Sequence, residues 1–211
     1  MLRITEIFFS IQGEAKFSGL PTVFIRLTGC PMRCVYCDSA YAFHGGEKRG
    51  VMDIIQEAQQ YNTPYITITG GEPLAQPQCL DLMTSFCDQG FIVSLETGNA
   101  VNIKNVDERV HVVLDIKTPD SKEEKNNHYE NLELIKSTDQ LKFVICSRKD
   151  YEWSREFILN RKISGQCEVL FSPAAQQLEG KELAEWILED QLAVRFQTQL
   201  HKQLWGDIPG V

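Results

Sequence analysis

The sequence of 211 residues contains no long apolar run, no excess of positive charge and no segment of low complexity. A membrane-spanning helix needs about 20 consecutive, mostly apolar residues, and because no such stretch occurs, no membrane association is expected. Lys and Arg number 21 against 29 Asp and Glu, a formal net charge of −8, which argues against binding to nucleic acid. A small molecule is therefore the expected partner.

The chain also lacks a secretory leader, a repeat of fixed period and any linker rich in Pro, Ser or Gly. We therefore expect a cytoplasmic protein with reduced cysteines. We also expect a single domain over residues 1–211, since this length can bury one core. Hydrophobic residues make up 43% and charged residues 24%, as in ordinary soluble globular proteins.

Strand-like and helix-like segments alternate along the chain. Runs of β-branched and aromatic residues predict six strands, at residues 21–27, 64–69, 91–96, 110–116, 141–146 and 168–171. Amphipathic patterns predict helices over residues 50–61, 78–90, 150–160 and 181–189. The polar run 120–127 is expected to be a solvated surface loop.

This alternation predicts an α/β fold, a parallel sheet of about six strands with helical cover. A complete eightfold barrel typically needs about 250 residues, so we expect an incomplete TIM-like barrel. A dimer or the C-terminal tail could protect its open side. Ligands should gather at the carboxyl ends of the strands.

Three cysteines, Cys30, Cys34 and Cys37, follow the first predicted strand with the spacing C-x3-C-x2-C. A cubane iron–sulfur cluster is normally bound by four cysteines, so a loop that supplies three leaves one iron able to bind a small molecule. A Cys3His zinc site that includes His44 is the alternative, although no second C-x-x-C pair follows. A zinc- or cluster-binding interaction protein without turnover is a further alternative.

A second motif, Thr69-Gly-Gly-Glu-Pro73, directly follows the strand predicted over residues 64–69. Consecutive glycines allow backbone amides to approach a ligand without obstruction by a Cβ atom. An ordinary turn between a strand and a helix would also explain the two glycines. The Glu-Pro that follows them, downstream of the cysteine loop, favours cofactor binding.

The cysteine triplet, Tyr36 before its last cysteine and the Gly-Gly-Glu-Pro motif together resemble the radical S-adenosylmethionine superfamily. The resemblance implies a [4Fe–4S] cluster on Cys30, Cys34 and Cys37, which cleaves S-adenosylmethionine to a 5′-deoxyadenosyl radical. No side chain is then expected to act as the catalytic group. The implied contacts to the cofactor are Tyr36, Cys37, Asp38, Gly71, Glu72, Asp115, Lys117, Ser172, Pro173, Ala174 and Ala175.

Within that superfamily, the segments Phe9–Glu14, Phe24–Arg26 and Cys37–Ser39 are similar to the 7-carboxy-7-deazaguanine synthase family. This resemblance implies conversion of 6-carboxy-5,6,7,8-tetrahydropterin to 7-carboxy-7-deazaguanine, with loss of ammonia, on the route to queuosine and other deazapurines. It also implies Mg²⁺ on the Ser39 hydroxyl, an electron donor such as flavodoxin, and a homodimer. The implied substrate contacts are Ile11, Gln12, Gly13, Glu14, Arg26, Thr69, His201 and Pro209.

The guanidinium of Arg26 is suited to bidentate binding of a carboxylate. A salt bridge at the end of a strand is the alternative explanation for this residue.

Two positions depart from the pattern of the synthase family. Asp115-Ile-Lys117 stands where many members have Ser-x-Lys, and Glu14-Ala15 stands where Glu-Gly is more common. An Asp-x-Lys sequence at this place also resembles the glycyl-radical-enzyme activases, which share the cysteine spacing. An activase is therefore the alternative function, although the Gln12-Gly-Glu14 segment and Asp38-Ser39 argue against it.

Overall fold

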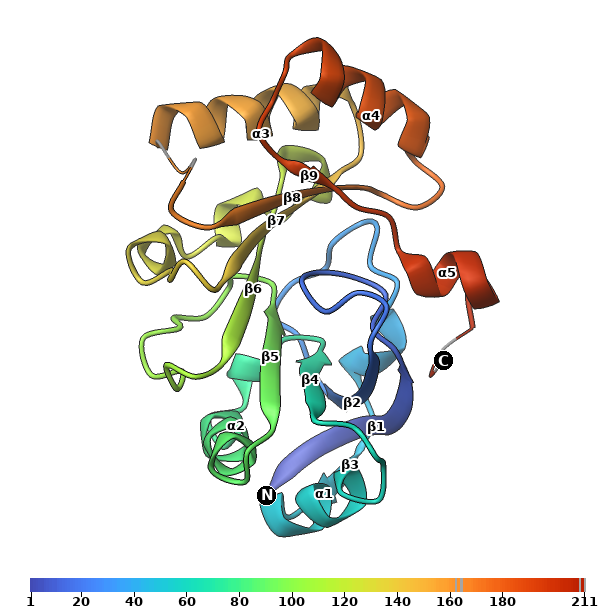
Figure 1. Ribbon diagram of the computed structural model, residues 1–211, viewed down its shortest axis with the longest axis vertical. Coiled ribbons are helices and arrows are strands. Elements are labelled where there is room, and N and C mark those ends of the chain that lie inside the picture. The colour runs from blue at the N-terminus through green and yellow to red at the C-terminus, as the bar shows by residue number, and fades with distance from the viewer. Residues whose placement is uncertain (162, 164, 209, 211) are drawn as a thin grey trace.

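The computed structural model describes residues 1–161, 163, 165–208 and 210, and these residues form a sheet of nine strands (Figure 1). The strand order is β3-β1-β2-β4-β5-β6-β7-β8-β9, so the sheet is open, with β3 and β9 at its edges. The strands are β1 (Leu2–Ile11), β2 (Pro21–Leu27), β3 (Glu47–Arg49), β4 (Tyr65–Gly70), β5 (Ile92–Thr97), β6 (His111–Ile116), β7 (Gln140–Ile145), β8 (Glu168–Pro173) and β9 (Arg195–Phe196).

All six predicted strands are present, as β2, β4, β5, β6, β7 and β8, and neighbouring strands from β2 to β9 pair in parallel. The prediction of an incomplete, TIM-like barrel is therefore confirmed. Three further strands extend the sheet beyond the prediction. Strand β1 pairs antiparallel with both β2 and β3, and β9 adds two residues beside β8.

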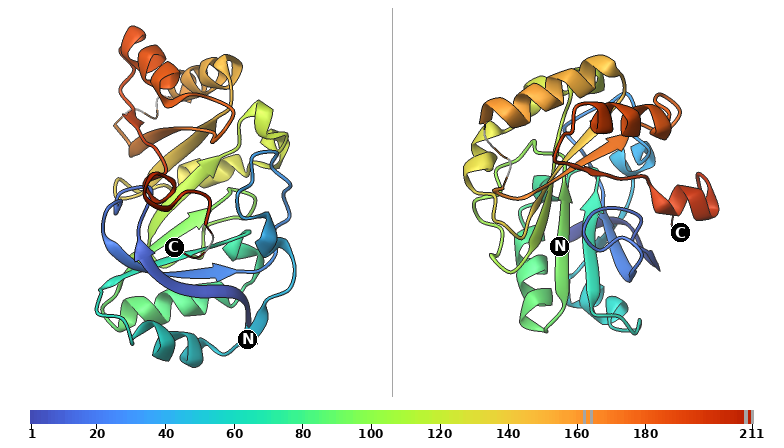
Figure 2. Two further views of the ribbon diagram at one scale, coloured as in Figure 1. Left: turned by 90° about the vertical axis from the view of Figure 1, so that its right-hand side faces the viewer. Right: turned by 45° about the horizontal axis from the view of Figure 1, so that its top comes forward.

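The four predicted helices are also confirmed, as α1 (Val51–Ala58), α2 (Cys79–Asp88), α3 (Arg148–Arg161) and α4 (Gly180–Glu189). Helices α3 and α4 lie together at one end of the molecule, and α1 and α2 lie at the other (Figure 1). A fifth helix, α5 (Leu200–Trp205), stands apart from these four and close to the C-terminus, as the views of Figure 2 show. No helix in the described part of the chain is long and apolar enough to cross a membrane.

The middle of the sheet is held by apolar side chains that no solvent reaches. Ile25, Ile68, Leu95, Leu114 and Phe143 each come from a different parallel strand, and each is fully buried. Complete burial of one such side chain contributes about 1.5–3 kcal/mol to folding. These residues fix the strands relative to one another, so polar residues at the carboxyl ends of the strands keep a defined geometry.

The prediction of a solvated loop over residues 120–127 holds for Lys122, Lys125 and Asn126, which are exposed, and is wrong for the rest of its structure. Short 3-10 turns span Pro119–Ser121 and Glu124–Asn126, and the side chains of Ser121 and Asn127 are buried. The polar side chains are satisfied internally, since Ser121 Oγ donates to the Thr118 carbonyl at 2.6 Å. The segment thus packs beside the carboxyl end of β6 and takes part in building the site.

Candidate active site

A cavity of about 290 Å³ lies at the carboxyl ends of the parallel strands. It collects residues from distant parts of the chain, as expected for a sheet of this kind. Nearly all of the residues named from the sequence line it: Ile11, Gln12, Gly13, Glu14, Arg26, Cys30, Cys34, Tyr36, Cys37, Asp38, Ser39, Thr69, Gly71, Asp115, Lys117, Ser172, Pro173, Ala174, Ala175 and His201. Glu72 does not line it, and Pro209 lies outside the described residues.

The three cysteines of the loop after β2 are free thiols that are partly buried in the cavity wall. The loop is held by backbone hydrogen bonds, from Gly29 N to the Ala42 carbonyl at 2.8 Å and from Cys37 N to the Cys34 carbonyl at 3.2 Å. Burial raises the pKa of all three thiols, that of Cys34 to about 11. Binding of a metal cluster as thiolates would therefore release protons.

The described residues do not form a Cys3His zinc site. His44 is exposed and does not line the cavity. Among residues 1–161, 163, 165–208 and 210, no three His, Cys, Asp or Glu side chains converge as ligands of one metal ion. In a cubane, each thiolate binds a different iron, so convergence on one point is not required. The zinc alternative has no fourth ligand here.

The loop that follows β4 lies directly against the cysteine loop. Gly71 N donates to the Leu27 carbonyl at 3.1 Å, and Glu72 N donates to the Gly29 carbonyl at 2.8 Å. A Cβ atom on Gly71 would lie 2.3 Å from the Gly29 carbonyl oxygen and 2.8 Å from Cys30 Cβ. Only glycine allows the two loops to meet this closely.

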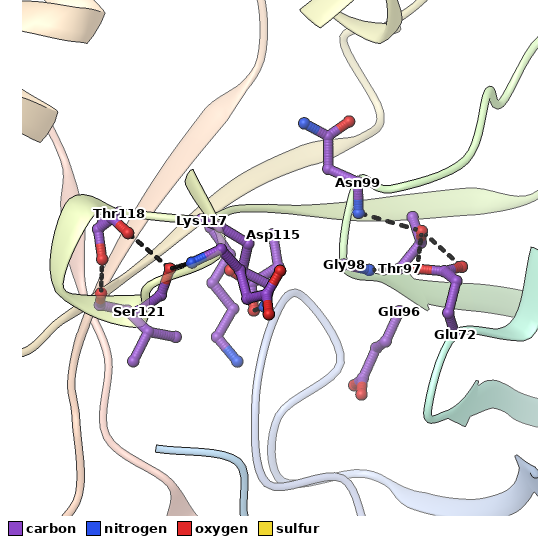
Figure 3. Close-up of polar contacts among 12 residues, drawn as sticks. Glu72, Glu96, Thr97, Gly98, Asn99, Asp115, Lys117, Thr118 and Ser121 are labelled. Carbon is purple, nitrogen blue, oxygen red and sulfur yellow. Dashed lines mark hydrogen bonds and ion pairs between the residues drawn. The ribbon is translucent and has the colours of Figure 1, made fainter. Parts of the chain in front are cut away.

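The side chain of Glu72 does not line the cavity and connects this loop to the end of β5, as Figure 3 shows. Its carboxylate accepts hydrogen bonds from Thr97 Oγ1 at 2.9 Å, Gly98 N at 2.8 Å and Leu74 N at 3.1 Å. Burial raises the pKa of Glu72, although these hydrogen bonds act in the opposite direction. The structure thus gives Glu72 a positioning role, and its direct contact with the cofactor stays a prediction.

Two polar atoms in the wall near the cysteines lack a partner. Tyr36 Oη and Asp115 Oδ1 are buried and make no hydrogen bond within the described part of the chain. The other oxygen of Asp115 pairs with Lys117 Nζ at 2.9 Å. Asn127 holds the backbone of Lys117 from both sides, because its Oδ1 accepts from Lys117 N at 2.9 Å and its Nδ2 donates to the Lys117 carbonyl at 2.8 Å. A polar ligand that enters the cavity would find two unpaired atoms there.

A second part of the wall, at the ends of β1, β4 and β5, carries a network of buried polar groups. Gln12 Nε2 donates to Thr67 Oγ1 at 3.0 Å and to Glu96 Oε1 at 3.3 Å. Thr69 Oγ1 donates to the other oxygen of Glu96 at 3.1 Å. Burial and the nearby Glu14 raise the pKa of Glu96. This part of the cavity therefore presents hydrogen-bonding groups in fixed positions.

Several polar lining residues were not expected from the sequence, among them Glu96 and Lys142. Lys142 forms an ion pair with Glu14, and this pairing lowers the pKa of Glu14 although burial opposes it. Glu96 and Lys142 each carry the one charge of a mostly apolar strand. This pattern was the available signal, because a charged group in a buried strand needs a partner or a ligand.

The segment around α5 closes over the loop at Gly13. Leu200 N donates to the Gly13 carbonyl at 3.0 Å, and a Cβ atom on Gly13 would lie 2.0 Å from His201 Nδ1. Gln199 Nε2 bridges Glu14 Oε1 at 2.8 Å and Asp38 Oδ2 at 3.0 Å. Hydrogen bonding from Gln199 and the charge of Lys202 lower the pKa of Asp38 to about 2, although burial opposes them. The C-terminal segment is thereby joined to the cysteine loop.

We predict that Gly71→Ala destabilises the protein and reduces its capacity for a cluster. The added Cβ must displace Gly29 and Cys30, and overpacking of this kind costs about 1–3 kcal/mol. Urea denaturation and the iron content after reconstitution measure both effects. Gly50→Ala is the control, because its Cβ would meet only the flexible Asp53 carboxylate, at 2.9 Å. Equal iron content in the two variants would contradict the prediction.

We also predict that Glu72→Gln lowers the free energy of unfolding by about 1–3 kcal/mol, since its amide nitrogen would face backbone and hydroxyl donors. Urea denaturation measures the difference. Glu57→Gln is the matched control, because Glu57 pairs with Arg49 at 2.7 Å and its side chain is 31% exposed. Loss of a pair at that exposure costs about 0–1 kcal/mol. An effect at Glu72 no larger than the effect at Glu57 would show that the buried carboxylate is not needed.

Comparison with known proteins gives consistent matches over the whole chain. The profile of the Radical SAM superfamily matches residues 24–158. A 7-carboxy-7-deazaguanine synthase from Chlorobaculum tepidum is 41% identical over 100% of this chain and 97% of its own length. A 7-carboxy-7-deazaguanine synthase from Koribacter versatilis is 39% identical over 97% of each chain. The crystal structure of QueE from Escherichia coli aligns with a TM-score of 0.76 at 21% identity, and the alignment covers 95% of this chain and 94% of that one.

Proposed function

Because the chain belongs to the 7-carboxy-7-deazaguanine synthase family of the radical SAM superfamily, we propose that it makes 7-carboxy-7-deazaguanine. The substrate is 6-carboxy-5,6,7,8-tetrahydropterin, and ammonia is released. The observation that carries the proposal is that the cysteine triplet and the Gln12–Glu14 segment line the same cavity. The product would serve queuosine and related deazapurines.

The family implies a [4Fe–4S] cluster and S-adenosylmethionine. When bound, they supply a 5′-deoxyadenosyl radical that abstracts hydrogen from the substrate. Cys30, Cys34 and Cys37 would hold the cluster, and the half-buried free thiols support this assignment. The structure offers partners for the polar groups of S-adenosylmethionine at Tyr36 Oη and Asp115 Oδ1, which are otherwise unpaired.

The remaining contacts to S-adenosylmethionine are assigned along the same wall. Lys117 and Asp38 supply charged groups. Gly71 leaves its backbone accessible to the ligand because it has no side chain, and Glu72 holds the loop that carries Gly71 in place. The end of β8 completes this wall with Ser172, Pro173, Ala174 and Ala175.

The pterin is assigned to the part of the wall that carries Gln12, Thr69 and Glu96. Its carboxylate would meet Arg26, and its pyrimidine edge carries N–H donors suited to the carboxylates of Glu14 and Glu96. Gln12 and Thr69 hold Glu96 in place through hydrogen bonds. His201 would close the pocket from the C-terminal segment, and Ile11, Gly13 and Pro209 complete the assigned set. Burial lowers the pKa of His201, which favours the neutral imidazole.

We assign Mg²⁺ to Ser39 and the substrate carboxylate. Ser39 Oγ donates its proton to Asp38 Oδ1 at 2.9 Å, so its lone pairs are free for a hard cation. Reduction by a donor such as flavodoxin, assembly as a homodimer and a cytoplasmic location belong to the same proposal. The glycyl-radical activase is not favoured, because the relatives that match the full chain are named as synthases.

Turnover by the reconstituted holoenzyme tests this function. The anaerobic protein, with reductant, S-adenosylmethionine, Mg²⁺ and the carboxy-tetrahydropterin, should form 7-carboxy-7-deazaguanine and ammonia, detected by mass spectrometry. Cys34→Ala should form no product, because it removes one of three cluster ligands. Omission of Mg²⁺ should slow the reaction. Cleavage of S-adenosylmethionine that is independent of the pterin and yields no deazaguanine would contradict the proposal.

A further inference from the structure

The side chain of Arg26 is oriented by a residue that lies outside the cavity lining, Glu6. The two residues face each other across β1 and β2, and Arg26 Nε donates to Glu6 Oε1 at 2.6 Å. The pairing depends on an irregularity in β1. Ile4 pairs with Leu27, and the next paired residue of β1 is Glu6, opposite Arg26, so Thr5 is the extra residue of a β-bulge. Bulges redirect side chains in this way.

Tyr41 completes the support. Its hydroxyl donates to the same oxygen of Glu6 at 2.7 Å. The guanidinium carbon of Arg26 lies 5.7 Å from the centroid of the Tyr41 ring and 5.8 Å from that of Phe8. One edge and the plane of the guanidinium are therefore restrained. Its two Nη nitrogens make no hydrogen bond within the described residues, although Arg26 itself lines the cavity.

We infer that Glu6 and Tyr41 are positioning residues that hold the Nη edge of Arg26 ready for bidentate contact with the substrate carboxylate. The inference rests on the proposed function, which places that carboxylate at Arg26. Glu6 would help through the orientation of Arg26 and not through charge, because its negative charge weakens the attraction of Arg26 for an anion. A restrained guanidinium loses less rotational freedom when the ligand binds, and this favours affinity.

Substitution of Glu6 and of Arg26, singly and together, tests the inference. Glu6→Ala should raise KM for the carboxy-tetrahydropterin about tenfold, since a hydrogen bond to a charged group is lost. Glu6→Gln keeps an acceptor for Arg26 Nε and should stay within about threefold of the wild type. In an Arg26→Ala background, Glu6→Ala should not raise KM further, because the effects of residues that act through one another are not additive.

Calorimetry with 6-carboxypterin and with unsubstituted pterin gives a readout that is independent of turnover. Glu6→Ala and Tyr41→Phe should weaken binding of the carboxylated pterin and leave binding of the plain pterin unchanged. Tyr41→Phe keeps the ring over Arg26, so it supplies the test if Glu6→Ala does not fold. Glu57→Ala is the control, because it breaks the pair between Arg49 of β3 and Glu57 of α1, and neither residue lines the cavity.

Two results would overturn the inference. In the first, the Glu6→Ala enzyme has the same KM as the Glu57→Ala control. In the second, Glu6→Ala raises KM by the same factor whether or not Arg26 is present. A protein that binds 6-carboxypterin through Arg26 and Glu6 but forms no deazaguanine would contradict the proposed function alone. A protein that binds neither pterin would overturn both.

Discussion

The close contact between two loops at the carboxyl ends of β2 and β4 is the constraint on which the site depends. Gly71 lies against Gly29 and Cys30 with no space for a side chain, and backbone hydrogen bonds join the two loops. Glu72 continues the connection to β5 through Thr97 and Gly98. The cysteines are thereby fixed to the rigid centre of the sheet, although they lie on a loop.

Charges around the cavity are arranged in pairs. Lys117 pairs with Asp115 near the cysteines, Lys142 pairs with Glu14 beside them on β7, and Arg26 pairs with Glu6 across β1 and β2. Buried pairs of this kind contribute little net stability, because desolvation offsets their attraction. Their value lies in orientation, since each cation is held in one place before a charged ligand enters. The salt bridge considered for Arg26 from the sequence is present, and it leaves the Nη nitrogens of Arg26 available.

Strands β2 and β4 to β8 and helices α1 to α4 were predictable, because their apolar patterns are local. About half of the cavity lining was named from the resemblance to a known family and not from local patterns. The spacing of Cys30, Cys34 and Cys37 was the signal in the sequence for a cluster site. Other features depend on contacts between distant residues. The burial of Asn127 follows from its hydrogen bonds to Lys117, and β9 is too short to leave a pattern. The position of Glu6 depends on a bulge, and the role of Glu72 depends on Thr97 and Gly98.

The proposed function requires S-adenosylmethionine and the pterin to share one cavity, so that a hydrogen atom passes directly between them. Transfer of deuterium from substrate labelled at C6, the carbon that bears the carboxylate, measures this step. We expect deuterium to appear in the 5′-deoxyadenosyl group during turnover by the holoenzyme. Product formation with all of the deuterium released to solvent, and none in that group, would contradict it.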